Sequence, residues 1–169
     1  MSMKHAAFTQ PLTDAELQEL GRLVVNCGFV DFLLDIHAGM TFRLDGVARR
    51  KLIAPMATRK KMEIIESHLV DIPQAATRQL VEEAVKLINP TIRARNYLLH
   101  GIWGMDGSYE NAQSIVISPK DDQGHKSPED ITVAADSLAV ASEKLARALA
   151  EDGGGTWTIP DRLVIQLSK

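Results

Sequence analysis

Three side chains that suit phosphodiester chemistry lie close together in the sequence: Arg95, Asn96 and His100. An arginine guanidinium matches a phosphate with paired hydrogen bonds, and a histidine exchanges a proton near neutral pH. His100 would therefore handle protons, while Arg95 would hold the phosphate and stabilise charge in the transition state. Asn96 would orient the imidazole or the phosphate. These residue types predict phosphodiester cleavage without a metal ion.

Helix geometry limits how these groups can meet. At about 100° per residue, Arg95 falls on the same stripe as Ile88, Ile92 and Leu99, so it places a permanent charge in an apolar face. Such a charge is costly unless an anion lies near it. Arg95 and His100 are separated by about 140° around the helix axis, so they cannot share one flat surface. They can converge only in a cleft, for example where two bundles meet.

Other basic side chains are candidate substrate contacts. Arg93 precedes the three residues on the same expected helix. Lys60 and Lys61 occupy the first turn of a helix expected over residues 58–70, where positive charge opposes the helix dipole. Such a placement can serve anion binding, and a solvated lysine face is the alternative.

The first helix is expected to begin at Thr13, which forms a capping-box pattern with Glu16. Apolar residues then recur every three or four positions, at Leu17, Leu20, Val24, Cys27, Val30 and Leu34. Further apolar residues widen this face, which predicts burial on two sides. Gly39 is the expected stop.

Further helical segments follow along the chain. A short apolar and basic piece over residues 47–54 is closed by Pro55, and the helix over residues 58–70 comes next. A third segment opens at Ile72 and Pro73. Asn89 and Pro90 interrupt it, which predicts either a kink or a fresh helix from Pro90 to about residue 101. The last helix is expected over residues 134–151, and the glycines at 153–155 stop it and act as a hinge.

The stretch after His100 has a different pattern. The β-branched run at 114–118 predicts a short strand, paired as a hairpin with residues 101–109. Residues 121–128 predict a polar surface loop, and residues 131–133 are a further candidate strand. We therefore expect one all-α domain over residues 1–169. It is a helical bundle of four to five helices with a small β-hairpin or strand insert at about 104–133 and a flexible tail at about 153–169.

Composition limits the classes of function. A chain of 169 residues suits one domain, and a net charge of -3 gives no global attraction to nucleic acid, so any RNA contact has to be local. The single cysteine, Cys27, excludes an intrachain disulfide and a cysteine-based zinc site. We predict no metal and no cofactor. The first ten residues lack the pattern of an export signal and no long apolar run occurs, so we expect a cytoplasmic protein without a membrane span.

Arg95, Asn96 and His100, with four residues between the arginine and the histidine, resemble the motif of the HEPN superfamily. Gly101 and Trp103, directly after the histidine, are similar to those of small bacterial members. The resemblance implies a helical bundle, usually a homodimer, that acts as a metal-independent endoribonuclease of a toxin or antiphage system. RNA and an antitoxin or other partner protein are then the expected partners. A two-fold dimer would supply the second proton carrier that one chain lacks.

Each of these residues also has a structural alternative. Arg95 would pair with a carboxylate such as Glu63, Glu66 or Glu83, and His100 would cap the end of its helix. The chain would then be a non-catalytic helical module that binds a partner protein or a nucleotide. Two other groups of acidic residues and histidines, at residues 31–37 and 63–68, lack the spacing of a metal site and predict polar helix faces.

Overall fold

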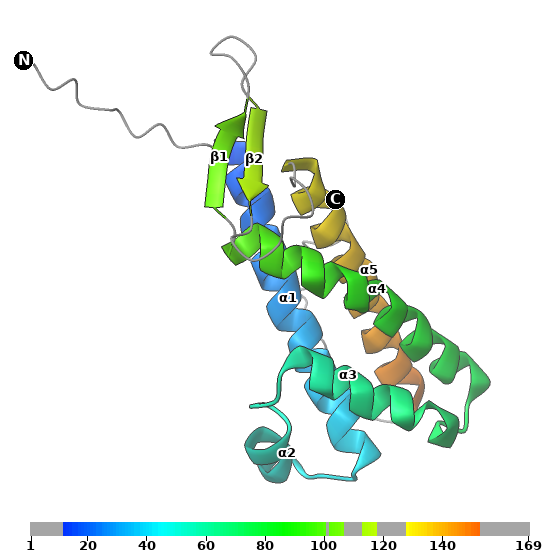
Figure 1. Cartoon of the computed structure of the whole chain (residues 1–169). Coiled ribbons are helices and arrows are strands. Elements are labelled where there is room, and N and C mark those ends of the chain that lie inside the picture. The colour runs from blue at the N-terminus through cyan, green and yellow to red at the C-terminus, as the bar shows by residue number, and fades with distance from the viewer. Residues whose placement is uncertain (1–11, 101, 107–112, 118–127, 153–169) are drawn as a thin grey trace, which may run out of the picture.

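The computed structural model describes residues 12–100, 102–106, 113–117 and 128–152. Five α-helices form a bundle in this part of the chain (Figure 1), which confirms the predicted helical fold. Their bounds are α1 Asp14–Thr41, α2 Gly46–Leu52, α3 Thr58–Ser67, α4 Ala75–His100 and α5 Pro128–Asp152. A short 3-10 helix, η1 (Leu69–Asp71), follows α3, so the helix predicted over residues 58–70 ends earlier than expected.

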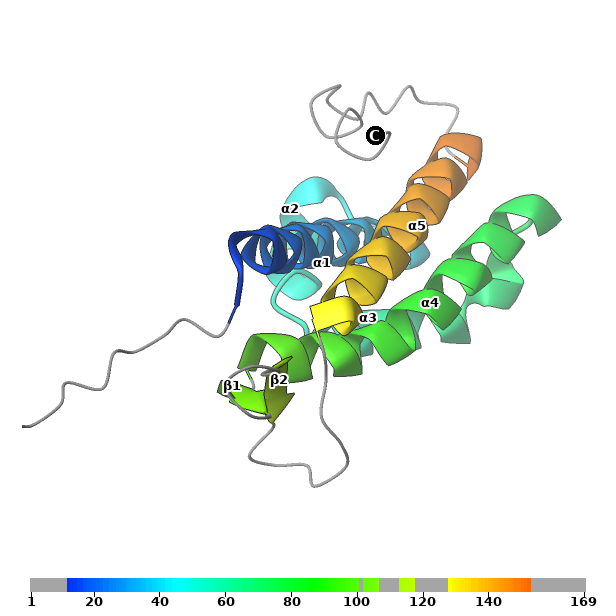
Figure 2. The same ribbon diagram turned by 90° about the horizontal axis from the view of Figure 1, so that it is seen from above.

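The core is formed mainly by α1, α4 and α5, with α5 between the other two (Figure 2). Most of the largest fully buried apolar side chains come from these three helices; they include Leu23, Leu34, Ile88, Leu98, Ile131, Leu138 and Leu145, and Ile53 at the end of α2 joins them. Such residues recur every three or four positions, so each helix turns one apolar side inward and removes it from water. Packing of these sides holds the bundle together.

The start of α1 is as predicted, but its end is not. The Thr13 amide donates to Glu16 Oε2 at 2.6 Å and the Glu16 amide donates to Thr13 Oγ1 at 3.3 Å, which is the capping box. The helix continues through Gly39 to Thr41, so Gly39 is not the stop. Gly39 is buried against Arg49 of α2, whose Cδ would lie 2.8 Å from a Cβ at position 39. The glycine therefore serves the packing of α2.

Among the described helices, α1 has the length and composition needed to cross a membrane. Half of the most apolar stretch of α1 is buried inside the bundle, and helices in the core of soluble proteins have the same length and composition.

The α4 helix contains Pro90 in its interior. A fresh helix at Pro90, one of the two predicted alternatives, is therefore wrong. Proline removes one backbone donor and costs about 3 kcal/mol in a helix interior. Ile88 and Thr91 on either side of it are buried, and Thr91 Oγ1 donates to the Leu87 carbonyl at 2.7 Å. Tertiary packing thus offsets the local cost.

The α5 helix begins at Pro128, earlier than the predicted residue 134, so the candidate strand at residues 131–133 is wrong. Ile131, Ala135 and Leu138 are buried at helical spacing, and Glu129 and Asp130 lie in the first turn, where acidic side chains favour a helix. The β-branched residues that suggested a strand are accommodated because one side of the helix packs in the core.

Two short strands are described between α4 and α5. They are β1 (Ile102–Asp106) and β2 (Gln113–Ile117), and they pair antiparallel with Ile102 opposite Ile117 and Asp106 opposite Gln113. The loop predicted over residues 121–128 lies outside the described residues except for Pro128, which begins α5, and the tail over residues 153–169 lies outside them as well.

Candidate functional site

Arg95 lies on α4 beside a hollow of about 340 Å³. Four polar residues from three helices share the lining of this hollow: Cys27 and Asp31 from α1, Thr58 from α3 and Arg95 itself. Apolar residues, including Val24 of α1 and Leu138 of α5, form the rest of the wall. Because Arg95 lies on the apolar stripe predicted from the sequence, its guanidinium lies where α4 faces α1, α3 and α5.

The Arg95 guanidinium bonds the side chains of Asn96 and Cys27. Its Nη1 donates to Asn96 Oδ1 at 2.9 Å, whereas Nε is buried and has no hydrogen-bond partner within the described part of the chain. Asn96 therefore contacts the Arg95 guanidinium, whereas the sequence alone predicted that it orients the imidazole or the phosphate. A buried donor without an acceptor costs free energy, which an incoming acceptor would recover.

The three carboxylates predicted as structural partners of Arg95 do not form ion pairs with it. Glu63 pairs with Lys60 at 3.3 Å and Arg59 at 3.4 Å, and Glu83 pairs with Lys144 at 2.6 Å. Glu66 forms no ion pair with Arg95 either, and the same holds for every carboxylate in the described ranges. The charge of Arg95 is not neutralised by any described residue.

Cys27 lines the same hollow, and the pKa of its thiol depends on the charge of Arg95. Burial raises the pKa of the Cys27 thiol, and the positive charge of Arg95 opposes this rise with a smaller effect. The thiol is half-buried and mostly protonated at neutral pH. Sequence inspection gave Cys27 only a place on the apolar face of α1, because its nearness to Arg95 depends on the packing of two distant helices.

His100 is the last residue of α4 and is exposed. It is not among the residues that line the hollow beside Arg95. The structure therefore places Arg95 and Asn96 in contact but leaves His100 on a different side of the helix, as the angle of about 140° required.

The three predicted substrate contacts have different environments. Arg93 on α4 and Lys60 on α3 are exposed, and Lys60 pairs with Glu63. Lys61 is fully buried, with Nζ 2.7 Å from Asp31 Oδ2 and 2.5 Å from Asp35 Oδ1. Its ammonium is thus inaccessible and already neutralised, so Lys61 does not contribute to a substrate surface. The sequence did not show that α3 turns this position toward α1.

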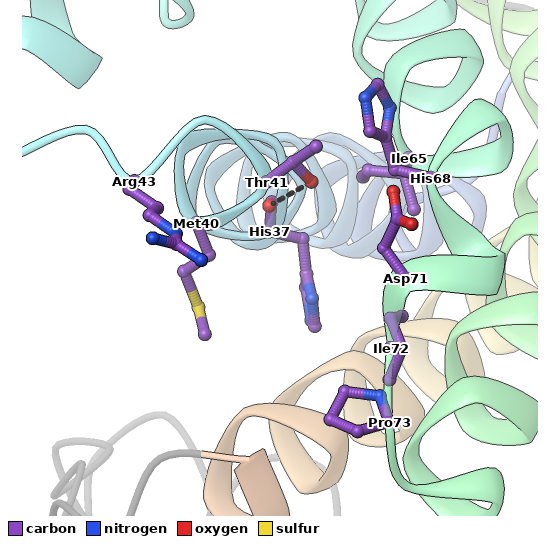
Figure 3. Close-up of a pocket in the computed structure, with 9 residues that line it drawn as sticks. All are labelled: His37, Met40, Thr41, Arg43, Ile65, His68, Asp71, Ile72 and Pro73. Carbon is purple, nitrogen blue, oxygen red and sulfur yellow. Dashed lines mark hydrogen bonds between the residues drawn. The ribbon is translucent and has the colours of Figure 1, made fainter.

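A second hollow, of about 240 Å³, lies where the end of α1 meets the end of α3, η1 and the loop before α4 (Figure 3). Its lining includes His37, His68, Asp71 and Arg43, which the sequence analysis did not bring together. His37 Nε2 contacts the Leu145 carbonyl at 3.0 Å, and His68 Nδ1 contacts the Ile64 carbonyl at 2.9 Å. Both imidazoles are therefore held by backbone carbonyls of the fold.

Within the described ranges, no three histidine, cysteine, aspartate or glutamate side chains are grouped to hold a metal ion. The two aspartates that precede His37 on α1, Asp31 and Asp35, both pair with Lys61.

Comparison of the chain with models of known protein families, with curated protein sequences and with solved structures finds no match. The function has to be inferred from the chemistry of its own residues.

Proposed function

We propose that this chain is a metal-independent endoribonuclease of HEPN type, active as a homodimer with a composite site. Arg95 binds the scissile phosphate, Asn96 orients its guanidinium, and His100 carries protons. The observation that supports this assignment best is the state of Arg95. Its charge lacks a described carboxylate partner and its Nε lacks an acceptor beside an open hollow, so an external anion is the missing partner.

The proposed reaction needs two proton carriers. The 2′-hydroxyl of RNA attacks the phosphorus atom and loses its proton to one imidazole, while the 5′-oxygen leaves and takes a proton from a second acid. The products are a 2′,3′-cyclic phosphate and a free 5′-hydroxyl. Each chain offers one exposed His100, so we propose that two copies supply the base and the acid.

Arg93 and Lys60 remain proposed contacts to the RNA backbone, because both are exposed. We also propose that the β1–β2 pair, which begins two residues after His100, is an insert beside the site and not part of the bundle core. A toxin or antiphage role, with an antitoxin as partner, follows from the resemblance alone.

Incubation of the purified chain with single-stranded RNA in EDTA tests the assignment. Cleavage should fall by about 10²–10³-fold in Arg95→Ala and in His100→Ala, as expected when a group that stabilises or protonates the transition state is lost. Lys86→Ala is the matched control, because Lys86 is an exposed cation of α4 that pairs with Glu82 at 2.7 Å. Equal cleavage by all four proteins would exclude the nuclease.

The alternative is a non-catalytic helical module that binds a partner protein or a nucleotide. The net charge of -3 favours it, because nucleases that bind RNA broadly usually carry a positive field. Under this alternative, all four proteins are inactive on RNA, and the Arg95 hollow binds an anion without turnover.

A further inference from the structure

Six residues form an exposed, uncharged stripe along α1. They lie at spacings of three, four or one residue, which confines them to an arc of about 100° on the helix surface. The stripe consists of Leu17, Gly21, Val24, Val25, Gly28 and Phe32, and its valines are about half exposed, at 50% and 57%. It extends for about 22 Å along the helix axis.

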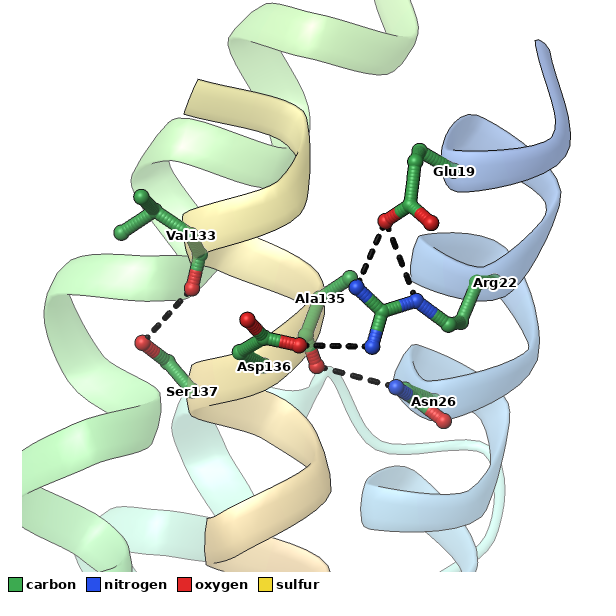
Figure 4. Close-up of polar contacts among 7 residues, drawn as sticks. All are labelled: Glu19, Arg22, Asn26, Val133, Ala135, Asp136 and Ser137. Carbon is green, nitrogen blue, oxygen red and sulfur yellow. Dashed lines mark hydrogen bonds and ion pairs between the residues drawn. The ribbon is translucent and has the colours of Figure 1, made fainter. Parts of the chain in front are cut away.

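The rest of the fold fixes the direction in which this α1 stripe points. On the opposite side of α1, Arg22 pairs with Asp136 of α5 at 2.6 Å, and Asn26 Nδ2 donates to the Ala135 carbonyl at 2.9 Å (Figure 4). Glu19 holds the Arg22 guanidinium in place, also at 2.6 Å. With Leu23 and Val30 fully buried, α1 cannot rotate to cover the stripe, so six uncharged residues stay in contact with water.

The α1 stripe is symmetric about the point between Val24 and Val25. Gly21 and Gly28 lie at equal distances from this point, and so do Leu17 and Phe32. A two-fold axis through it would therefore place α1 of one copy antiparallel to α1 of the other, with like partners in contact. Self-complementarity of this kind is the requirement for a two-fold interface.

Two further features fit an α1–α1 contact. Nothing lies within 4 Å of a Cβ built at Gly21 or Gly28, so both glycines are open for the close approach of another helix. At the far end, the Arg49 guanidinium of α2 lies 5.7 Å from the ring centroid of Phe32. Asp14 lies on the same line of α1 as Phe32, five helical turns earlier, so antiparallel packing brings Asp14 of one copy toward Arg49 of the other.

We propose that the α1 stripe binds the α1 stripe of a second copy of this chain, antiparallel, and that this contact borders the Arg95 hollow. Val24 and Gly28 belong both to the stripe and to the wall of the hollow. The second copy therefore lies beside the hollow and brings the two Arg95 sites to one interface. The role of this interface in catalysis rests on the proposed function, but the association does not.

Sedimentation of the full chain is the first test. At micromolar concentration the native chain should have twice the monomer mass, and Val24→Glu should give a monomer because two carboxylates would meet near the axis. Val140→Glu is the matched control, since Val140 is an exposed valine of α5 outside the stripe, and it should remain dimeric. Circular dichroism should show that both variants keep their helices. A native chain that stays monomeric overturns the proposal.

Disulfide trapping then tests the antiparallel register, in a Cys27→Ser background with oxidised glutathione as oxidant. Two thiols are oxidised to one disulfide while glutathione disulfide is reduced to two thiols. An equal mixture of Leu17→Cys and Phe32→Cys chains should form a mixed disulfide dimer. Leu17→Cys alone should not, because its two copies lie about 22 Å apart, beyond the Cα separation of about 7 Å that a disulfide spans. Efficient cross-linking of Leu17→Cys alone overturns the antiparallel contact.

These outcomes separate the two proposals. A dimer that does not cleave RNA excludes the nuclease and keeps the interface. A monomer that cleaves RNA keeps the nuclease activity and excludes both the α1 interface and the composite site. A monomer that sediments with anionic lipid vesicles, and loses them on Val24→Glu, would assign the α1 stripe to a membrane surface and overturn the second copy as its occupant.

Discussion

Two cations, Lys61 and Arg95, point into the region where α1 meets α3 and α4, and their surroundings differ. Lys61 is fully buried and lies within 2.7 Å of the carboxylates of both Asp31 and Asp35. Arg95 is half-buried, bonds the amide of Asn96 and has no carboxylate partner in the described ranges. A buried charge needs a partner. Lys61 therefore stabilises the fold, while Arg95 keeps a charge without an ionic partner, which the proposed function assigns to an external anion.

The largest expected effect is on stability. Lys61→Met leaves Asp31 and Asp35 facing each other without a cation and should lower the free energy of unfolding by about 3–5 kcal/mol, measured by urea denaturation. Arg95→Met removes an unpaired charge and should change it by less than about 1 kcal/mol. Equal losses in the two variants would remove the distinction between the two cations.

A triple variant sharpens the same comparison. Replacing Lys61 by Met together with Asp31→Asn and Asp35→Asn removes the whole ionic cluster and leaves no uncompensated charge. Such replacements cost less than the loss of one partner, so the triple variant should be about 1–3 kcal/mol more stable than Lys61→Met in the same urea titration. A triple variant less stable than Lys61→Met would show that the cluster is held by more than charge.

The reactivity of Cys27 tests whether the Arg95 charge reaches the hollow. Burial raises the pKa of this thiol and the Arg95 charge lowers it, so Arg95→Met should raise it further. Alkylation by iodoacetamide at pH 8 should then slow by about two- to five-fold, because the thiolate is the reacting form. Lys86→Met is the control and should leave the rate unchanged. Faster alkylation of Arg95→Met would mean that the arginine acts by shielding the thiol.

The smallest effect concerns a half-buried pair between α4 and α5, Glu83 and Lys144. Hydrogen bonds from Lys144 hold the pKa of Glu83 below its ordinary value of 4.5. A carboxyl with a lowered folded pKa stabilises the fold above its unfolded pKa, and this contribution is lost as pH falls through the folded pKa. Lys144→Met should therefore flatten the loss of stability below about pH 4.5, measured by thermal unfolding at several pH values. An unchanged dependence of stability on pH in this acidic range would show that the Glu83–Lys144 pair does not contribute to stability in solution.

The sequence predicted much of the helical framework because local signals are strong there. The capping box of Thr13 and Glu16 and the apolar periodicity predicted α1. The strand predicted at residues 131–133 was wrong, because β-branched residues favour a strand only where tertiary packing does not select a helix. Arg95 was identified by its place on an apolar stripe. Lys61 was wrongly predicted to contact a substrate, because nothing in its local sequence reveals its contacts with Asp31 and Asp35, which lie 30 and 26 positions earlier.

What the sequence alone determined is which residues share a helix face, because about 100° of rotation per residue is a local property. It therefore gave the angle between Arg95 and His100 and the symmetric order of residues 17–32. The tertiary structure decided which of those faces meet another helix. Packing of α1 against α5 through Leu23, Asn26 and Val30 leaves the α1 stripe facing water. The packing of α3 against α1 places Asp31 and Asp35 beside Lys61, and neither of them pairs with Arg95. Contacts between distant segments depend on how the surfaces of whole helices pack together, and the spacing of residues along one helix does not specify that packing.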